Sequence, residues 1–402
     1  MTPASSPPPA GPDSGLSPKA VAAGLLTALV GYASSVAVVI QGLAAVGADT
    51  AQIVSALVAV GMAMGLLAMG LSLHSRKPIS IAWTTPGAAL LAATGPMDGG
   101  FPAAVGAFIV TAGLVMAAGL WTPLGRWVAA IPRPLANAML AGILLKLCLA
   151  PFAAVGQAPG VALLVLATWA VVGRVARLYA VPAAVLVALG AMALDASGGL
   201  PAGAAWPGLV FVEPVFTAEA LVGIALPLFI VTMASQNIPG LAVLATYDYW
   251  PKTRPIFLAT GAASAATALA GAPTVNLAAI TAALCASPDA DPNPARRWQA
   301  AFVGGLGYIA LAALAGVTAT MVTRSPPVLI EAVAGLALIG AFGSALLATV
   351  QAEENRTAAL VTLLVTASGL SFGGVGSAFW GLLLGGAVHL LHSGRLVPRP
   401  AA

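Results

Sequence analysis

The stretch PISIAWTTPGAALLAATG, residues 78–95, opens with alternating apolar and β-favouring residues and is interrupted at Thr85-Pro86-Gly87. A second stretch, AGAPTVNLAAITAALC over residues 270–285, repeats this order with an interruption at residues 273–276. Each apolar run is short for a membrane-crossing helix, which needs about 20 residues. Short, Pro/Gly-interrupted segments at matching places in two halves of a chain are typical of a transporter's binding site. These two stretches therefore predict a pair of broken spans.

The composition of the whole chain places these stretches in a membrane. Of 402 residues, 60% are hydrophobic and 7% are charged, and the mean hydropathy is +0.99. Soluble domains carry about 25% charged residues because their surface faces water. A chain with so few charges must face lipid. We therefore expect an all-α polytopic membrane protein in contact with the lipid bilayer, with no nucleic-acid partner.

Apolar runs between charged or Pro/Gly-rich breaks predict about fourteen transmembrane segments, seven in each half. The predicted segments are 19–43, 51–72, 79–94, 102–122, 133–150, 160–178, 180–195, 219–245, 253–269, 272–286, 298–320, 327–349, 356–370 and 374–393. An odd number per half gives the halves opposite orientations, which is the inverted-repeat design of many transporters. The predicted domains are a disordered N-terminal tail (1–18), a first repeat (19–195), a connection (196–218), a second repeat (219–393) and a C-terminal tail (394–402).

The distribution of basic residues indicates the orientation. With a cytoplasmic N-terminus, only Lys146 and Arg324 of the 16 basic residues fall toward the outside. Cytoplasmic loops carry an excess of Lys and Arg, so this bias predicts that both termini are cytoplasmic. The connection at 196–218 then lies outside.

The two broken spans offer a way to bind an anion. A broken helix exposes unpaired N–H groups and a partial positive charge where its second half begins. Two such ends aimed at one point hold an anion without a buried Lys or Arg. Polar residues in the first and eighth spans add possible contacts, because amides in hydrocarbon need partners. The predicted substrate-binding residues are Tyr32, Ser35, Thr84, Thr85, Pro86, Gly87, Gln236, Asn237, Thr274, Val275, Asn276 and Leu277. Kinks in ordinary helices and helix–helix hydrogen bonds are the alternative interpretation.

Signs of enzyme chemistry are weak. The stretch GLSFG, residues 369–373, has the letters of a nucleophile elbow but lies between two spans, outside the strand–turn–helix context of that motif. Cys148 and Cys285 lie in apolar stretches, which favours buried core residues over a metal site or disulfide. We therefore expect a protein that is not an enzyme and that needs no metal or cofactor.

Several segments together resemble the benzoate:proton symporter (BenE) family. They are SSVAVVIQGLAAVGA (34–48), PISIAWTTPGAALLA (78–92), TMASQNIPGLAVL (232–244) and GAPTVNLAAITAALCASPDADPNPARRW (271–298). The resemblance covers nearly the whole chain after the N-terminal tail. It implies uptake of benzoate or a related aromatic carboxylate, driven by protons across a bacterial inner membrane. A homodimer is a further expectation.

This family is distantly similar to uracil-permease-like nucleobase transporters and sulfate-permease-like anion transporters. The likeness implies that each broken span begins as a short strand and continues as a half-helix. It also implies core domains at 19–122 and 219–320 and gate domains at 133–195 and 327–393. Nucleobase relatives carry carboxylates where this chain has Gln236, Asn237 and Asn276, a departure that fits an anionic substrate. The proton carrier is then unidentified, with Glu331 as a candidate.

Three alternatives stay open at this point. The same fold could carry a nucleobase or another organic anion, or the protein could be an anion channel that uses the same helix ends. Dependence on a proton gradient separates a transporter from a channel, and competition by benzoate analogues separates the substrates.

The predicted orientation can be tested by labelling. We expect Ser197→Cys, in a chain whose Cys148 and Cys285 are replaced, to react with a membrane-impermeant thiol reagent in intact cells. The reason is that the connection lies outside when the basic loops lie inside. Labelling that requires a permeabilised inner membrane would contradict this orientation.

Overall fold

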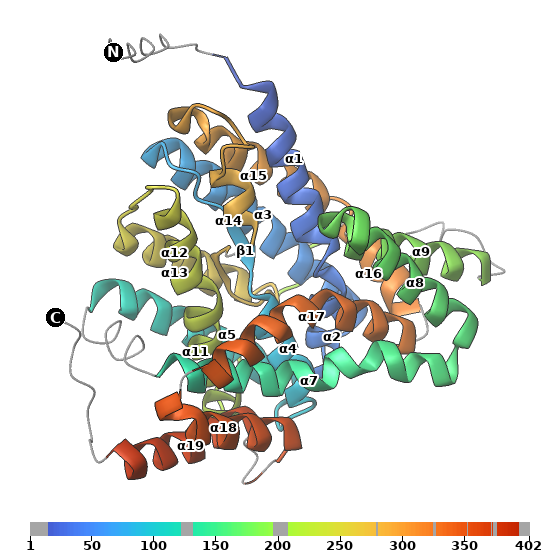
Figure 1. The fold of residues 1–402 in the computed structure, drawn as a ribbon, viewed down its shortest axis with the longest axis vertical. Coiled ribbons are helices and arrows are strands. Elements are labelled where there is room, and N and C mark those ends of the chain that lie inside the picture. Colours follow the sequence, from blue (N-terminus) through green and yellow to red (C-terminus); the bar gives the residue numbers. More distant parts are fainter. Residues whose placement is uncertain are drawn as a thin grey trace, which may run out of the picture.

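The computed structural model describes residues 15–121, 132–195, 208–278, 280–324, 327–351, 353–370, 372 and 376–393. Helices dominate these residues (Figure 1). The parts of the predicted tails and connection at 1–14, 196–207 and 394–402 lie outside the described residues.

The elements follow one another in the same order in both halves. The first half contains α1 (Pro18–Ala33), α2 (Val36–Ala45), α3 (Thr50–Ser75), β1 (Ile81–Trp83), α4 (Thr85–Thr94), α5 (Gly100–Leu120), α7 (Arg133–Gln157), α8 (Pro159–Val175), η1 (Arg177–Tyr179) and α9 (Ala180–Asp195). The second half contains α10 (Ala218–Ala220), η2 (Leu221–Ala225), α11 (Leu226–Thr232), η3 (Met233–Asn237), α12 (Ile238–Thr246), α13 (Thr253–Ala268), β2 (Val275–Leu277), α14 (Ile280–Ala286), η4 (Pro294–Arg296), α15 (Trp298–Ala312), α16 (Ala315–Arg324), α17 (Pro327–Gln351), η5 (Glu353–Asn355), α18 (Arg356–Ser368) and α19 (Ser377–Ser393). Each half thus has a three-residue strand followed by a short helix at its third segment.

Six helical segments among the described residues are long and apolar enough to cross a membrane. They are Pro18–Ala45, Thr50–Ser75, Gly100–Leu120, Arg133–Gln157, Ala218–Thr246 and Val328–Gln351. The elements α10 to α12 form one of these segments, in which η2 and η3 are π-helical turns. The count of about fourteen spans stays a prediction.

Two spans that the sequence predicts as single helices are broken in the structure. The segment 19–43 divides into α1 and α2 at Ser34-Ser35, where the Ser35 hydroxyl donates to Gly31 O at 2.8 Å. The segment 298–320 divides into α15 and α16, where Leu314 N donates to Leu311 O instead of continuing the α-helical ladder. Local three- and four-residue hydrogen bonds of this kind compete with the regular helix, and an apolar sequence gives little sign of them.

The strands β1 and β2 pair antiparallel, with Ile81 opposite Leu277 and Ala82 opposite Asn276. The ladder extends at both ends through Thr84 N to Thr274 O at 3.1 Å and Ala278 N to Ser80 O at 3.0 Å. The strands implied by the family resemblance are therefore present. The second half-helix, however, begins at Ile280 and not near Asn276, because residues 275–277 are extended to pair with β1.

The outward edge of β2 is satisfied by side chains. Val275 N donates to Ser264 Oγ at 2.9 Å, and Leu277 N donates to Asn237 Oδ1 at 3.0 Å. Both side chains are buried. In lipid an unpaired backbone group costs several kcal/mol, so these two bonds allow a strand to exist within an otherwise helical protein.

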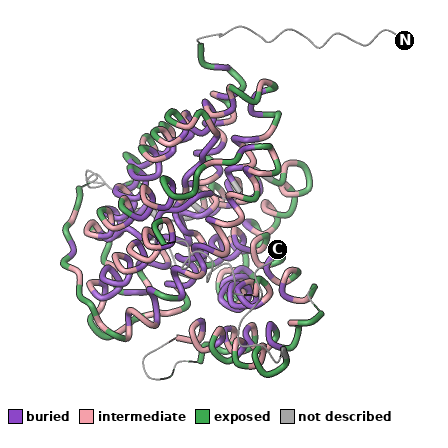
Figure 2. Tube along the Cα trace, turned by 90° about the vertical axis from the view of Figure 1, so that its left-hand side faces the viewer, coloured by how far each residue is buried: buried purple, intermediate pink, exposed green. Residues whose placement is uncertain are grey.

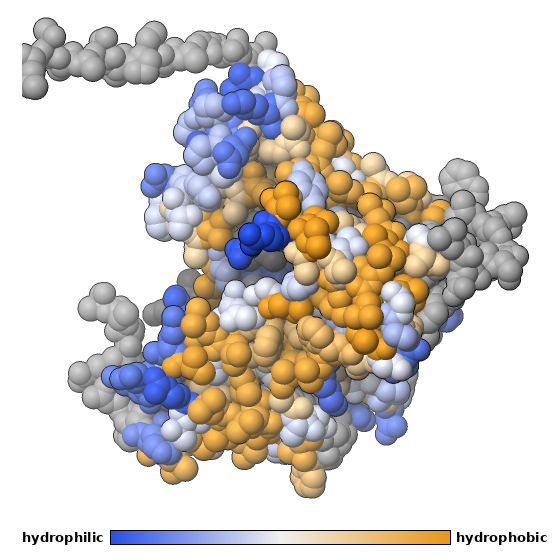
Figure 3. Space-filling model, turned by 45° about the vertical axis from the view of Figure 1, so that its right-hand side comes forward, coloured by the Kyte–Doolittle hydropathy of each residue, from blue (hydrophilic) through white to orange (hydrophobic). Residues whose placement is uncertain are grey.

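Buried residues fill the interior around the strands, and exposed residues follow the outer turns (Figure 2). The longest helices, α7 and α17, pack against each other across one side of the strand pair (Figure 1). The outer surface is largely hydrophobic on the face shown in Figure 3, with hydrophilic residues gathered toward the end nearest the N-terminus. This surface is what the composition predicts for a protein surrounded by lipid.

Close packing of α2 on α4 depends on Gly42. A Cβ at Gly42 would overlap the Ala88 carbonyl group, which belongs to the α4 backbone and cannot move aside. We expect Gly42→Ala to lower the melting temperature of the purified protein, because α4 must shift to make room. Gly70→Ala in α3 is the control, because a Cβ added at Gly70 would have no neighbouring atom within 4 Å. Equal losses in both variants would contradict this packing argument.

Candidate functional site

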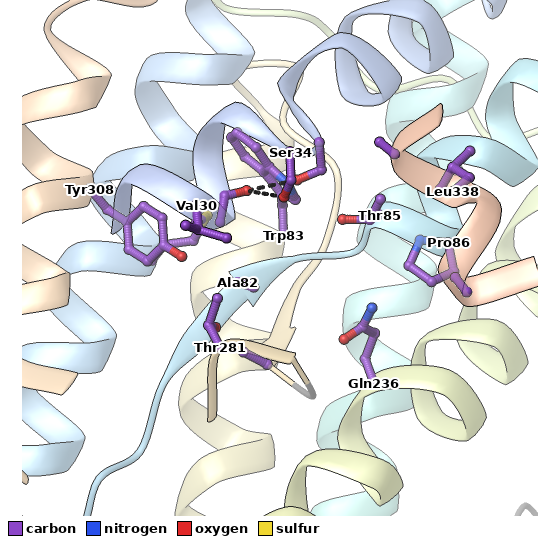
Figure 4. Close-up of a pocket in the computed structure, with 16 residues that line it drawn as sticks. Val30, Ser34, Ala82, Trp83, Thr85, Pro86, Gln236, Thr281, Tyr308 and Leu338 are labelled. Atoms are coloured by element: carbon purple, nitrogen blue, oxygen red, sulfur yellow. Dashed lines mark hydrogen bonds between the residues drawn. The ribbon is translucent and has the colours of Figure 1, made fainter. Parts of the chain in front are cut away.

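A cavity of about 100 Å³ lies beside the strand pair, where α1, α2, α4, α15 and α17 meet (Figure 4). Its lining comes from both halves of the chain. The lining residues are Val30, Gly31, Ser34, Ser35, Met64, Ala82, Trp83, Thr85, Pro86, Gln236, Ala278, Thr281, Tyr308, Ala337, Leu338 and Ala341. None of these described side chains is a carboxylate, an amine, a guanidinium or an imidazole.

The N-terminus of α4 opens onto this cavity through Thr85 and Pro86. Thr84 caps this helix, since its Oγ1 accepts from Gly87 N at 3.1 Å and is bonded to Thr232 Oγ1 at 3.1 Å. Proline in the first helical turn needs no hydrogen-bond acceptor for its nitrogen. The cap and the proline fix the helix start, and the helix dipole places a partial positive charge at the cavity.

A second helix start, that of α2, also lies at the cavity. Ser34 and Ser35 line it at the break between α1 and α2. The Trp83 indole Nε1 donates to Ser35 Oγ at 2.8 Å, and that hydroxyl in turn donates to Gly31 O. Trp83, which is 1% exposed, thus ties the break in the first span to β1. Two helix N-termini meet here, but they belong to α2 and α4 rather than to α4 and α14.

Aromatic and aliphatic side chains form the rest of the wall. Trp83 and Tyr308 are both 1% exposed, and Leu338 of α17 closes the side opposite β1 (Figure 4). Apolar pockets with a few convergent polar groups are the usual form of a small-molecule site. The arrangement suits a flat apolar ring with one polar end.

Four of the predicted substrate-binding residues line the cavity, namely Ser35, Thr85, Pro86 and Gln236. Three others stand directly behind it. Tyr32 packs on Trp83 with ring centroids 5.3 Å apart, and Thr84 and Gly87 form the α4 cap.

The remaining predicted residues build the strand pair and do not line the cavity. They are Asn237, Thr274, Val275, Asn276 and Leu277. The amide of Asn276, oriented to satisfy its neighbours, donates to Leu277 O at 2.8 Å and accepts from Thr84 N at 3.1 Å. The N–H groups of Gly87 and Leu277, predicted to meet a carboxylate, already donate to Thr84 and Asn237.

Several lining residues were not predicted from the sequence. Trp83 lies inside the first quoted stretch, and a buried aromatic next to a helix break was a signal for it. Thr281, Tyr308 and Leu338 come from α14, α15 and α17, where a single polar or large residue in an apolar run does not show which way it points.

The ionisable residues considered as proton carriers lie away from the cavity. His74, Lys146 and Glu331 are all exposed in the structure, and none of them is among the lining residues.

With this geometry in view, comparison with known proteins identifies the family. A model of the family described as "Benzoate membrane transport protein" (BenE) matches residues 14–391. The chain belongs to this family. It is therefore a multi-pass membrane transport protein, and the family is not a family of enzymes.

Two relatives illustrate the relationship. The BenE chain is 40% identical over 382 residues to the inner membrane protein YdcO of Escherichia coli, covering 93% of this chain and 96% of YdcO. It is 30% identical over 367 residues to the benzoate membrane transport protein of Acinetobacter baylyi, covering 91% of this chain and 93% of that protein.

Solved structures show the same fold at low sequence identity. The transmembrane domain of the cyanobacterial bicarbonate transporter BicA has a TM-score of 0.58 at 16% identity, covering 93% of this chain and 96% of that domain. SLC26A9 has a TM-score of 0.60 at 14% identity, covering 93% of this chain and 65% of SLC26A9. The BenE chain thus has the fold of these membrane transporters.

The neighbouring residues Gln236 and Asn237 separate site from scaffold. We expect Asn237→Leu to lower the free energy of unfolding by about 1–3 kcal/mol, because it leaves Leu277 N–H buried without an acceptor. We expect Gln236→Met, at the cavity wall, to cost less. Thermal melts of the purified variants measure both. A larger loss for Gln236→Met than for Asn237→Leu would contradict this division of roles.

Proposed function

We propose that this protein is a secondary active transporter that takes up benzoate, or a related aromatic carboxylate, together with protons across the bacterial inner membrane by alternating access. The observation that carries the proposal is the uncharged cavity at the start of α4, walled by Trp83 and Tyr308. Membership of the BenE family and the name of the Acinetobacter relative support it.

The size of the cavity supports a single aromatic ring. Its volume of about 100 Å³ is of the same order as the apolar cavity of about 150 Å³ that binds benzene in an engineered protein. The ring would lie between Trp83, Tyr308 and Val30, where aromatic pairs add about 0.5–1.5 kcal/mol beyond the buried area.

The carboxyl group would lie at the polar end formed by Ser34, Thr85 and Gln236, between the N-termini of α2 and α4. A helix N-terminus stabilises a negative charge by up to about 2 kcal/mol in a partly buried site. Removing a carboxylate from water costs several kcal/mol. Two helix ends therefore offset only part of the cost of burying the anion.

Protonation of the substrate removes the remaining cost. A carboxyl group with an ordinary pKa of about 4.3 binds a proton more readily in an apolar cavity, because burial disfavours the charged form. In this mechanism the substrate itself carries the proton. The absence of carboxylate and histidine side chains from the described lining is then compatible with proton symport.

Alternating access would occur at the boundary between the predicted core and gate domains. The lining combines core elements α1, α2, α4 and α15 with α17 of the second gate segment. The antiparallel pairing of β1 with β2, which hold equivalent places in the two halves, supports the proposed inverted repeat. We retain the orientation with both termini cytoplasmic.

Uptake of radiolabelled benzoate into proteoliposomes tests this function. We expect accumulation above the outside concentration when the lumen is alkaline, and loss of accumulation when the pH gradient is collapsed. Flux that never exceeds equilibration would indicate a channel. Displacement of benzoate by uracil at equal concentration would favour the nucleobase alternative.

Three single variants test where the proton travels. We expect His74→Gln, Lys146→Gln and Glu331→Gln each to retain proton-driven accumulation, because these side chains are exposed and lie outside the cavity lining. Uptake with and without an imposed pH gradient is the measurement. If Glu331→Gln bound benzoate normally but lost the gradient dependence, Glu331 would be the proton carrier.

A further inference from the structure

Two hydroxyl groups lie at the end of the cavity away from α4. In Figure 4, Tyr308 and Thr281 occupy one side of the cavity, and Thr85, Pro86 and Gln236 occupy the other. Ala82 of β1 lies between the two sides. The cavity therefore has two polar ends separated by an apolar middle.

The hydroxyls of Tyr308 and Thr281 keep the capacity to accept a hydrogen bond. Tyr308 Oη donates to the Thr27 carbonyl oxygen at 3.4 Å, which uses its hydrogen. Thr281 Oγ1 is bonded to Ser80 Oγ at 3.0 Å. A hydroxyl oxygen has two lone pairs in addition to its hydrogen. A ligand that donates a hydrogen bond at this end would find acceptors.

Packing holds the Tyr308 hydroxyl in place. The side chain is 1% exposed, and its oxygen lies against Gly31 so closely that a Cβ there would overlap it. A group fixed in this way loses little freedom when it accepts a hydrogen bond, which favours discrimination between ligands.

We infer that the cavity selects an aromatic carboxylate with a hydroxyl group at the ring position opposite the carboxyl group. This inference rests on the proposed function, which places the carboxyl group at the α4 end. The ring then spans the apolar middle, and the ring hydroxyl donates to Tyr308 Oη or Thr281 Oγ1. A cavity without these oxygens would leave a buried ring hydroxyl unpaired and would bind it poorly.

Equilibrium binding to the purified full-length protein tests the inference, with benzoate, 4-hydroxybenzoate and 4-methylbenzoate as ligands. The methyl group has nearly the size of the hydroxyl but cannot donate. We expect Tyr308→Phe to lower the ratio of 4-hydroxybenzoate to 4-methylbenzoate affinity by about 2- to 10-fold, the range for one neutral hydrogen bond. Affinity for benzoate should change less than this ratio.

Thr281→Val repeats the test with a variant that keeps the side-chain shape, should Tyr308→Phe fail to fold. Tyr249→Phe is the matched control, because its hydroxyl donates to Pro294 O and lies outside the cavity lining. We expect Tyr249→Phe to leave the ratio unchanged. An unchanged ratio in both Tyr308→Phe and Thr281→Val would overturn the inference while leaving benzoate binding intact. Failure of all three ligands to bind the unmodified protein would overturn the proposed function itself.

Discussion

The pairing of β1 with β2 is the constraint on which the rest of the structure depends. Two extended segments of three residues lie among apolar helices, and each backbone N–H and C=O in such surroundings needs a partner. The strands satisfy one another along their facing edges. Asn237 and Ser264 then supply acceptors for the N–H groups on the outer edge of β2. The polar residues of the eighth span and of α13 are therefore required by the backbone conformation.

The strand pair also determines where α4 begins. Because β1 ends at Trp83, the chain can turn into a helix only at Thr84, whose hydroxyl caps the new helix. The same strand carries the Trp83 indole to Ser35, at the break between α1 and α2. Two helix starts thus meet at one cavity through a short series of hydrogen bonds. A long continuous helix at either place would remove both the cavity and its partial positive charge.

The chemistry of the cavity follows from what helix ends can do without charged side chains. Helix dipoles and hydroxyls favour an anion, but their summed effect is smaller than the cost of stripping water from a carboxylate. An Arg or Lys in the wall would bind the anion more strongly and would hinder its release. A site that binds the acid form, or an anion weakly, is better suited to a transporter that must release its substrate on the other side.

The sequence by itself determined that this chain lies in a membrane and where its two interruptions fall. Composition and the paired stretches at 78–95 and 270–285 carry that information locally. Ser35, Thr85, Pro86 and Gln236 were placed correctly at the cavity for the same reason, since they lie at or beside helix breaks. The tertiary structure alone decided that Asn237 supports a strand and that Tyr308 faces the cavity. Helices in lipid are apolar on most sides, so their sequence pattern does not reveal which face is turned inward. The partners are also distant in the chain: Asn237 bonds a residue 40 positions away, and Trp83 bonds one 48 positions away.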